Sequence, residues 1–184
     1  MGRHRKISRD TVLDAAERVV LRLGAAGLSI DAVAQEAGIS KATVMYDHKS
    51  KSALLEAMID RQLEAERKRI EAAVKDNAGT PHPELFGRIA VAERLLDDAD
   101  KAVAMAVSAS MSSAEKIPDT MREVTTENLK AVTRGPKPEA ALLAYLALMG
   151  FCCSEIFNFH NWNDAERARI LDGVRTIYLS YPET

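Results

Sequence analysis

The residues that most clearly suggest chemistry lie in one short stretch near the N-terminus, Ser40-Lys41-Ala42-Thr43. These side chains are small or cationic, so they can approach base edges and phosphates of DNA without steric conflict. A lysine can donate to a guanine edge or a phosphate, and a threonine can donate to a phosphate or place its methyl group against thymine. Ser40, Lys41, Ala42 and Thr43 are therefore candidate DNA contacts.

The spacing around this stretch predicts a helix-turn-helix. Ser29 can cap a short helix that runs to about Ala37, Gly38 suits a tight turn, and Ser40 can cap a second short helix to about Tyr46. Ala34 is small where the two helices would cross. Three apolar residues would form the core between them: Val33, Ile39 and Val44. The second helix would be the recognition helix in the major groove. A solvent-exposed helical hairpin without function is the alternative.

A basic arm, Gly2 to Lys6, precedes this region. Arg3 and Arg5 could lie along the DNA backbone or enter a minor groove. A terminus that only improves solubility is the alternative.

The second half of the chain offers candidates for a small-molecule site between its middle helices. Methionines suit adaptable pockets, and a few polar groups could orient a ligand. The candidates are Arg67, Phe86, Met105, Ser108, Met121, Thr125, Asn128, Phe151, Glu155 and His160. Each of these side chains could instead belong to an ordinary core or surface.

Two apolar helices near the C-terminus suggest an interface between two copies of the chain. The helix from Pro138 is apolar all round, which is typical of a helix that is buried on every side. Together with the last helix it would form a four-helix bundle across a two-fold axis. The candidate interface residues are Ala141, Ala144, Leu148, Cys152, Ile170, Val174 and Ile177. A core within one chain is the alternative.

The adjacent cysteines Cys152 and Cys153 would face different directions on a helix, so no ordinary disulfide is expected between them. Buried, unreactive thiols are expected. Cys153 and His160 share a face, but no third metal ligand is evident, and no metal or cofactor is predicted.

These features must be positioned by helices, because almost every segment has a helical period and none has a convincing strand pattern. The fold class predicted is all-α, with about nine helices. Expected helices cover about 9–23, 30–37, 41–46, 51–76, 84–96, 99–111, 119–132, 138–159 and 164–181.

Composition narrows the classes of function. The 184 residues are 47% hydrophobic and 28% charged, which is typical of a folded chain. Residues 1–51 hold nine Lys or Arg and six Asp or Glu, whereas the remainder holds 16 and 21. A slightly basic head thus precedes an acidic body, which favours a polyanion partner at the head. The longest uncharged run, Ala140–Ser154, is short for a membrane span. A cytoplasmic protein is expected, without a membrane partner.

The stretch from Val12 to Leu55 resembles the DNA-binding domain of the tetracycline-repressor (TetR) family. The resemblance lies in four segments: 12–18, 27–34, 37–44 and Lys49-Ser50-Lys51. It implies a homodimer that places two recognition helices in successive major grooves. It also implies that Ser29, Thr43, Tyr46, Lys49 and Lys51 lie near phosphates and Lys41 near bases.

The chain departs from the usual tyrosine–tyrosine–histidine–phenylalanine stretch of that family. Met45 replaces the first tyrosine, Asp47 the histidine, and His48 the phenylalanine. Asp47 would repel a phosphate, and it could instead hold Lys49, Lys51 or a helix N-terminus. His48 would be a packed histidine or a pH-sensitive DNA contact.

The resemblance implies a helix-turn-helix domain over 1–51 and a ligand-binding and dimerisation domain over 52–184. The expected function is a repressor that a small molecule releases from its operator. A constitutive or architectural DNA-binding protein, whose body only dimerises, is the alternative. An enzyme is not expected, because the sequence has no phosphate-binding glycine loop, metal-spaced cluster or nucleophile elbow.

Overall fold

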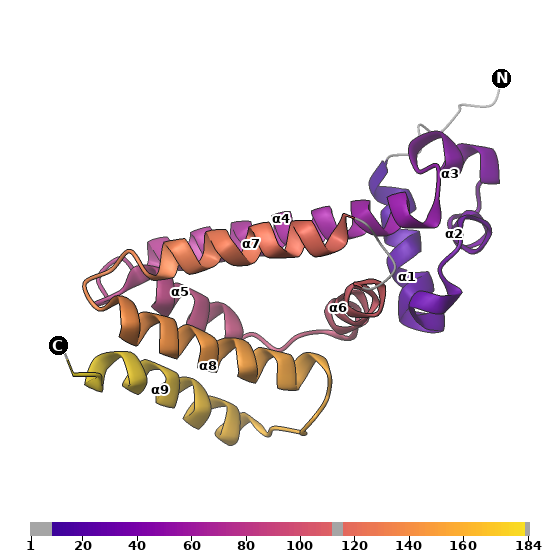
Figure 1. The fold of residues 1–184 in the computed structure, drawn as a ribbon. Coiled ribbons are helices and arrows are strands. Elements are labelled where there is room, and N and C mark those ends of the chain that lie inside the picture. The colour runs from indigo at the N-terminus through magenta and orange to yellow at the C-terminus, as the bar shows by residue number, and fades with distance from the viewer. Residues whose placement is uncertain (1–8, 112–115, 183–184) are drawn as a thin grey trace. The chain divides into compact units, whose positions relative to one another are not determined.

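The computed structural model describes residues 9–111 and 116–182, and within these ranges it contains nine helices and no strand (Figure 1). The all-α prediction is confirmed. The helices are α1 (Arg9–Gly27), α2 (Ile30–Ala37), α3 (Lys41–Asp47), α4 (Lys51–Asp76), α5 (Pro83–Ala92), α6 (Asp98–Ser110), α7 (Ile117–Val132), α8 (Pro138–Ile156) and α9 (Asp164–Ser180).

Three helix ends differ from the sequence-based expectation. Helix α1 continues past a kink at Gly24 to Gly27 rather than ending near Leu23. Helix α5 ends at Ala92 rather than near Leu96. Helix α8 ends at Ile156 rather than near Phe159, and Asn158 then adopts a left-handed backbone with φ 51°. Asparagine tolerates this conformation better than most residues, so the chain can turn there before α9 begins.

The chain divides into two compact units, which we call the head unit and the body unit. The head unit comprises the residues up to Leu63 together with Asp97–Pro118. The body unit comprises Glu64–Leu96 and the residues from Asp119 onward. Helix α4 therefore contributes its first half to the head unit and its second half to the body unit.

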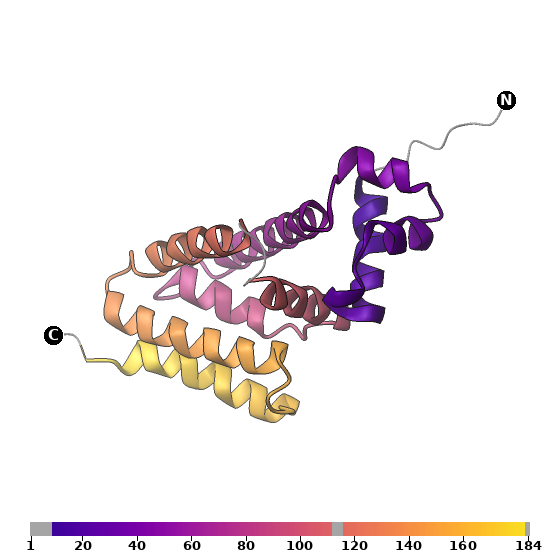
Figure 2. The same ribbon diagram turned by 45° about the vertical axis from the view of Figure 1, so that its right-hand side comes forward.

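The core of the head unit lies around α1, which packs on α2 and on α6 (Figure 2). Gly24, with φ 67° and ψ −179°, interrupts α1 at the point where its apolar period ends. Glycine is the residue that adopts this backbone without strain. The fully buried side chains of α1 recur at the spacing of one helix face: Val12, Leu13, Ala15, Ala16, Val19 and Val20.

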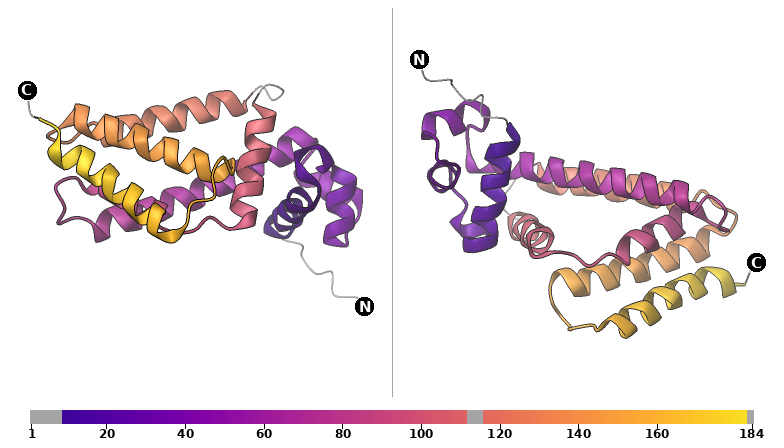
Figure 3. Two further views of the ribbon diagram at one scale, coloured as in Figure 1. Left: turned by 90° about the horizontal axis from the view of Figure 1, so that it is seen from below. Right: turned by 180° about the vertical axis from the view of Figure 1, so that it is seen from behind.

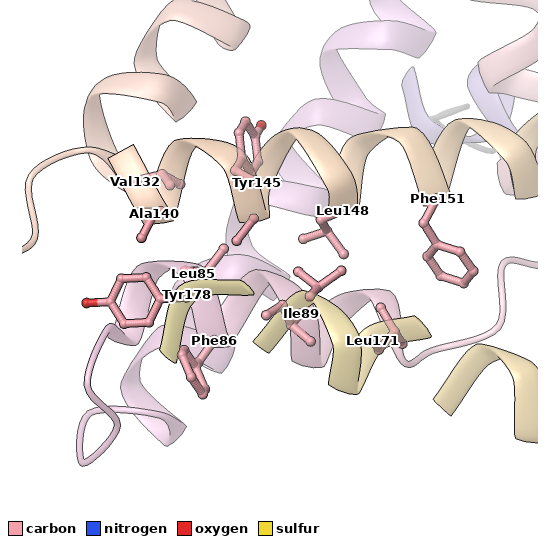
Figure 4. Close-up of a cluster of buried hydrophobic side chains, with 13 residues drawn as sticks. Leu85, Phe86, Ile89, Val132, Ala140, Tyr145, Leu148, Phe151, Leu171 and Tyr178 are labelled. Carbon is pink, nitrogen blue, oxygen red and sulfur yellow. The ribbon is translucent and has the colours of Figure 1, made fainter. Parts of the chain in front are cut away.

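The core of the body unit lies between α5, α8 and α9. Helices α8 and α9 run side by side, and the turn between them reverses the chain (Figures 1 and 3). Figure 4 shows Leu148 of α8, Ile89 of α5 and Leu171 of α9 meeting at the centre of this core. Buried apolar area of this kind is what holds a helical domain together.

A buried histidine joins three parts of the body unit. His82 Nδ1 accepts a hydrogen bond from the Leu85 backbone N–H (3.2 Å), so the ring caps α5. His82 Nε2 lies 2.7 Å from the carbonyl oxygen of Val132, at the end of α7, and donates to it in this tautomer. The ring also packs edge-on against Tyr178 of α9, with 5.2 Å between centroids.

Helix α8 is the helix among the described residues that is long and apolar enough to cross a membrane by length and composition. A core helix of a water-soluble domain passes the same test. In α8 one face is buried in the core of the body unit, through residues such as Ala141, Ala144 and Leu148.

Candidate nucleic-acid interface

The helix-turn-helix is held by the caps that the sequence predicts. The Ser29 side chain accepts from the Ala32 backbone N–H at 3.1 Å. The Ser40 side chain accepts from the Thr43 backbone N–H at 3.1 Å, and the two hydroxyl oxygens are 2.8 Å apart. Gly38 ends α2 with φ 66°, in the left-handed region that glycine favours. The two serine caps satisfy backbone N–H groups that would otherwise lack partners at the start of each helix.

Helix α3 is amphipathic in the way a recognition helix requires. Val44 is fully buried and attaches the helix to the head unit. Lys41 and Ala42 are exposed at its start, and Tyr46 is 86% exposed near its end. A large exposed aromatic side chain with a hydroxyl group is suited to contact a phosphate or a sugar. The exposed face thus combines small residues with one cation and one phenol.

Two cations of this region, Lys41 and Lys51, have partners within the head unit. Lys41 Nζ lies 2.9 Å from a carboxylate oxygen of Asp31, and both side chains are more than half exposed. Lys51 Nζ donates to the carbonyl oxygen of Ala25 at 2.7 Å, in the last turn of α1. A cation at that position also interacts favourably with the negative end of the helix dipole. Lys49 is exposed.

Glu36 joins α2 to α1 through two arginines. Its carboxylate contacts Arg18 Nε at 2.9 Å and Arg22 Nη1 at 3.0 Å. The hydrogen bond from Arg18, with the charge of Arg22, lowers the pKa of Glu36 below its ordinary value. The two ion pairs of Glu36 thus orient the helix-turn-helix on α1. Because they are exposed, they contribute little to stability.

The two unusual residues after α3 differ sharply in burial. His48 is 2% exposed, and its backbone N–H donates to the Val44 carbonyl oxygen at the end of the helix. Its burial agrees with a packed histidine rather than a DNA contact. Asp47 is exposed. The arm residues Arg3 and Arg5 lie outside the described residues.

The ten candidate ligand residues are divided between the two units and differ in exposure. Met105 and Ser108 are exposed on α6 in the head unit, whereas the other eight belong to the body unit. Arg67 is exposed on α4 and forms ion pairs with Glu64 and Glu71. Phe86 and Phe151 are part of the apolar core.

The remaining polar candidates have diverse surroundings. His160 is exposed and packs against Trp162, with 4.2 Å between ring centroids. Glu155 forms a buried ion pair with Arg167. Met121, Thr125 and Asn128 lie half-buried along α7. Like Glu155, Asn128 is half-buried and contacts a cation, in its case the guanidinium of Arg88.

Sequence reasoning missed Arg88 and Tyr145, which contact Asn128 from α5 and α8. The signal was present in α5, where Arg88 is a single cation inside the apolar run Leu85–Ala92. Burial of the ring raises the pKa of Tyr145, which keeps its hydroxyl protonated over the physiological range.

The candidate interface residues divide into two groups. Ala141, Ala144, Leu148 and Val174 are at most 4% exposed and lie in the chain's own core, so they are not surface residues. For these four residues the alternative interpretation, a core within one chain, is the one that the structure supports. Cys152 and Ile170 are half-buried, and Ile177 is exposed. The apolar side chains exposed on these helices are Leu143, Leu146, Ile177 and Leu179.

The two cysteines differ in environment. Cys152 is partly buried, and desolvation raises the pKa of its thiol to about 11. Cys153 is exposed, so the expectation of two buried thiols is wrong for this residue. Its position one residue further along α8 turns it by about 100° to the surface. Among the described residues no group of three His, Cys, Asp or Glu side chains could hold a metal ion.

The head unit is thus a helix-turn-helix of the kind that DNA-binding proteins use, attached to a helical body. Residues 12–58 match the family profile described as bacterial regulatory proteins, tetR family. Residues 86–177 match the profile of the tetracyclin repressor-like C-terminal domain. The chain belongs to the TetR family of transcriptional regulators.

Solved structures of low sequence identity share this fold over almost the whole chain. A transcriptional regulator from Pseudomonas aeruginosa PAO1 is 18% identical with a TM-score of 0.76, and the match covers 95% of this chain and 94% of that one. The multidrug binding protein EbrR, solved with imidazole, is 20% identical with a TM-score of 0.65, covering 90% and 93%. A SmeT–triclosan complex is 18% identical with a TM-score of 0.67, covering 90% and 88%. Among curated proteins, none matches this chain.

Proposed function

We propose that the protein is a homodimeric repressor that binds a DNA operator through the helix-turn-helix over residues 1–51 and is released by a small molecule. The observation that carries the DNA-binding part is the geometry of α3. Its buried Val44 anchors the helix, while Lys41, Ala42 and Tyr46 remain exposed for the major groove. Ser40 and Thr43 start the helix, and Ser29 and Lys49 flank it as phosphate contacts.

The proposed partner surface is the exposed side of α8 and α9. Glu139, Leu143, Leu146, Gly150 and Cys153 are all exposed and recur every three or four residues, so they form one face of α8. Gly150 has no atom within 4 Å of an added Cβ, which would let a second helix approach closely. On α9 the exposed Ile177 and Leu179 add apolar surface. A two-fold axis would join two copies of this face.

Small-molecule release is proposed for the ligand-binding and dimerisation domain over residues 52–184. The similarity to EbrR with imidazole and to SmeT with triclosan supports it, because both of those proteins were solved with small molecules bound. A ligand that binds the body better in one conformation would shift the population away from the head spacing that fits successive grooves. We propose a cytoplasmic location, where operator DNA is available.

A selection of binding sites from random DNA, followed by a salt titration and the mass of the complex, tests this function. A site with two-fold symmetry and a complex of two 20.2 kDa chains are expected. Each neutralised phosphate should contribute roughly −0.9 to the slope of log K against log salt. Leu146→Glu should yield monomers, whereas Glu139→Gln is a matched control on the same face. If no sequence is enriched, the proposal is wrong.

A constitutive DNA-binding protein is the second candidate. It predicts the same operator and dimer, but no small molecule would change the affinity for DNA.

A further inference from the structure

The body unit holds two buried arginines whose surroundings differ. Arg167 on α9 has a side chain 7% exposed, and its guanidinium forms an ion pair with the carboxylate of Glu155, whose side chain is 13% exposed. Its Nη2 also donates to the carbonyl oxygen of Ala92 at 3.0 Å. The charge and the hydrogen-bonding capacity of Arg167 are thus used inside the protein, which is the usual state of a buried arginine.

Arg88 on α5 is almost as buried, with a side chain 10% exposed, but its partners are weaker. Its Nη2 donates to the neutral amide oxygen of Asn128 at 2.9 Å. The carboxylate of Glu84 is 3.8 Å from Nη2 and is 39% exposed. Its Nε is buried and has no hydrogen-bond partner within the part of the chain that the structure describes. A buried cation with an unused donor destabilises the free protein unless something else binds it.

Two further polar groups lie around this guanidinium. The ring of Tyr145 on α8 is 5.7 Å from the Arg88 guanidinium carbon, and its hydroxyl is hydrogen-bonded to Asn128. Tyr145 belongs to the same buried cluster as Leu148, but Figure 4 shows that it points from α8 to the opposite side. Helices α5, α7 and α8 therefore each contribute one polar side chain to the same place.

The chemistry of this cluster selects an anion. A guanidinium binds a planar carboxylate through charge-assisted hydrogen bonds, and these are stronger where water is excluded. The amide of Asn128 and the phenol of Tyr145 add neutral donors. The cluster therefore offers several donors, and no carboxylate of the described residues accepts a hydrogen bond from Nε of Arg88. Apart from Glu84, the residues around Arg88 along α5 are apolar, so the remainder of a bound molecule would meet apolar side chains.

We propose that Arg88, Asn128 and Tyr145 form the anion-binding end of the effector site, and that the effector is a small organic carboxylate with an apolar remainder. This inference rests on the proposed function, because it names the chemical class of the molecule that releases the repressor. The carboxylate completes the hydrogen bonds of Arg88 and neutralises its charge.

Binding is measured by calorimetry and thermal shift on the full chain without DNA. The probes are benzoate, phenylacetate and octanoate, each compared with its own amide at equal ionic strength. At least one carboxylate should raise the melting temperature and bind at least tenfold more tightly than its amide. Arg88→Gln should weaken that binding at least tenfold. Arg122→Gln is the matched control, because Arg122 is 75% exposed on α7, and binding should change less than twofold.

A stability measurement separates a ligand-binding arginine from a structural one. Without ligand, Arg88→Met should leave the melting temperature unchanged or raise it, whereas Arg167→Met should lower it because Glu155 is then left buried and unpaired. The proposal is overturned if no carboxylate in the panel binds, if the amides bind equally well, or if Arg88→Met destabilises as much as Arg167→Met. Operator binding by the dimer is measured separately. If the protein binds its operator but binds none of the carboxylates, this inference is refuted and the proposed DNA-binding function is not.

Discussion

Replacing His82 by alanine removes the contacts that hold α5, α7 and α9 together in the body unit. The Leu85 N–H loses its cap, which costs about 1 kcal/mol for a typical N-cap. The Val132 carbonyl oxygen loses its buried donor at 2.7 Å, which costs about 1–3 kcal/mol. The edge-on contact with Tyr178 adds about 0.5–1.5 kcal/mol. Because the three contacts share one ring they are not additive, and we expect a total loss of about 3 kcal/mol.

The assay is urea unfolding followed by the fluorescence of Trp162, the single tryptophan of the chain, which lies in the body unit. A loss of about 3 kcal/mol corresponds to a decrease of roughly 6–12 °C in melting temperature for a chain of this size. His82→Asn is the control, because asparagine is a good N-cap but is too short to replace the ring at Val132. It should be destabilised about half as much. A loss below about 1 kcal/mol for His82→Ala, or equal losses for both variants, would refute this account of the ring.

Three further predictions concern packing, pH and thiol reactivity. Gly87→Ala should cost about 1–3 kcal/mol, because an added Cβ would lie 2.8 Å from the backbone of α4, whereas Gly79→Ala, with open space around it, should be nearly neutral in the same urea assay. The stability difference between the wild type and Glu36→Gln should be present above pH 4.5 and vanish as the pH falls through the lowered pKa of Glu36; a difference that persists at low pH would contradict it. In the monomeric Leu146→Glu variant, where Cys153 is not covered by a partner, iodoacetamide at pH 8 should label Cys153 quickly and Cys152 slowly, since the Cys152 pKa is about 11. Peptide mass mapping measures the order of labelling, and the reverse order would contradict this prediction.

Local patterns predicted the head unit well. Ser29 and Ser40 were expected to cap α2 and α3, and Gly38 was expected to form the turn, because capping and left-handed turns depend on residues adjacent in sequence. The structure confirms all three. The capping box of Asn163 and Glu166 at the start of α9, with both of its hydrogen bonds present, likewise depends on residues close in sequence.

Contacts between distant residues were harder to predict. An apolar helix such as α8 has no polar face to show which side meets the core, so Ala141, Ala144 and Leu148 were assigned to a partner although they are buried within one chain. Glu155 was expected to orient a ligand, but it pairs with Arg167 from a different helix. The period of a helix identifies a buried side but not the helix that buries it.

The candidate site of the body shows the same limit. Asn128 was singled out for its type, but its meaning depends on Arg88, which is 40 residues away in sequence. A single arginine within the apolar helix α5 is unusual enough to be noticed. Sequence alone could not show that its Nε would be buried without a partner, because that depends on three helices at once.

The internal contacts of Lys41 and Lys51 would affect how long the protein stays bound to DNA. Lys41 contacts Asp31, and Lys51 contacts a carbonyl oxygen of α1. In the proposed complex, a random DNA sequence would have to compete with these partners for each cation. Such competition lowers non-specific affinity and shortens each stay on DNA that offers only phosphates. An operator that also offers base contacts to α3 would compensate for the loss of these internal contacts. The contact between Asp31 and Lys41 would thus favour rapid dissociation from non-specific DNA, which leaves the protein more time to find its operator.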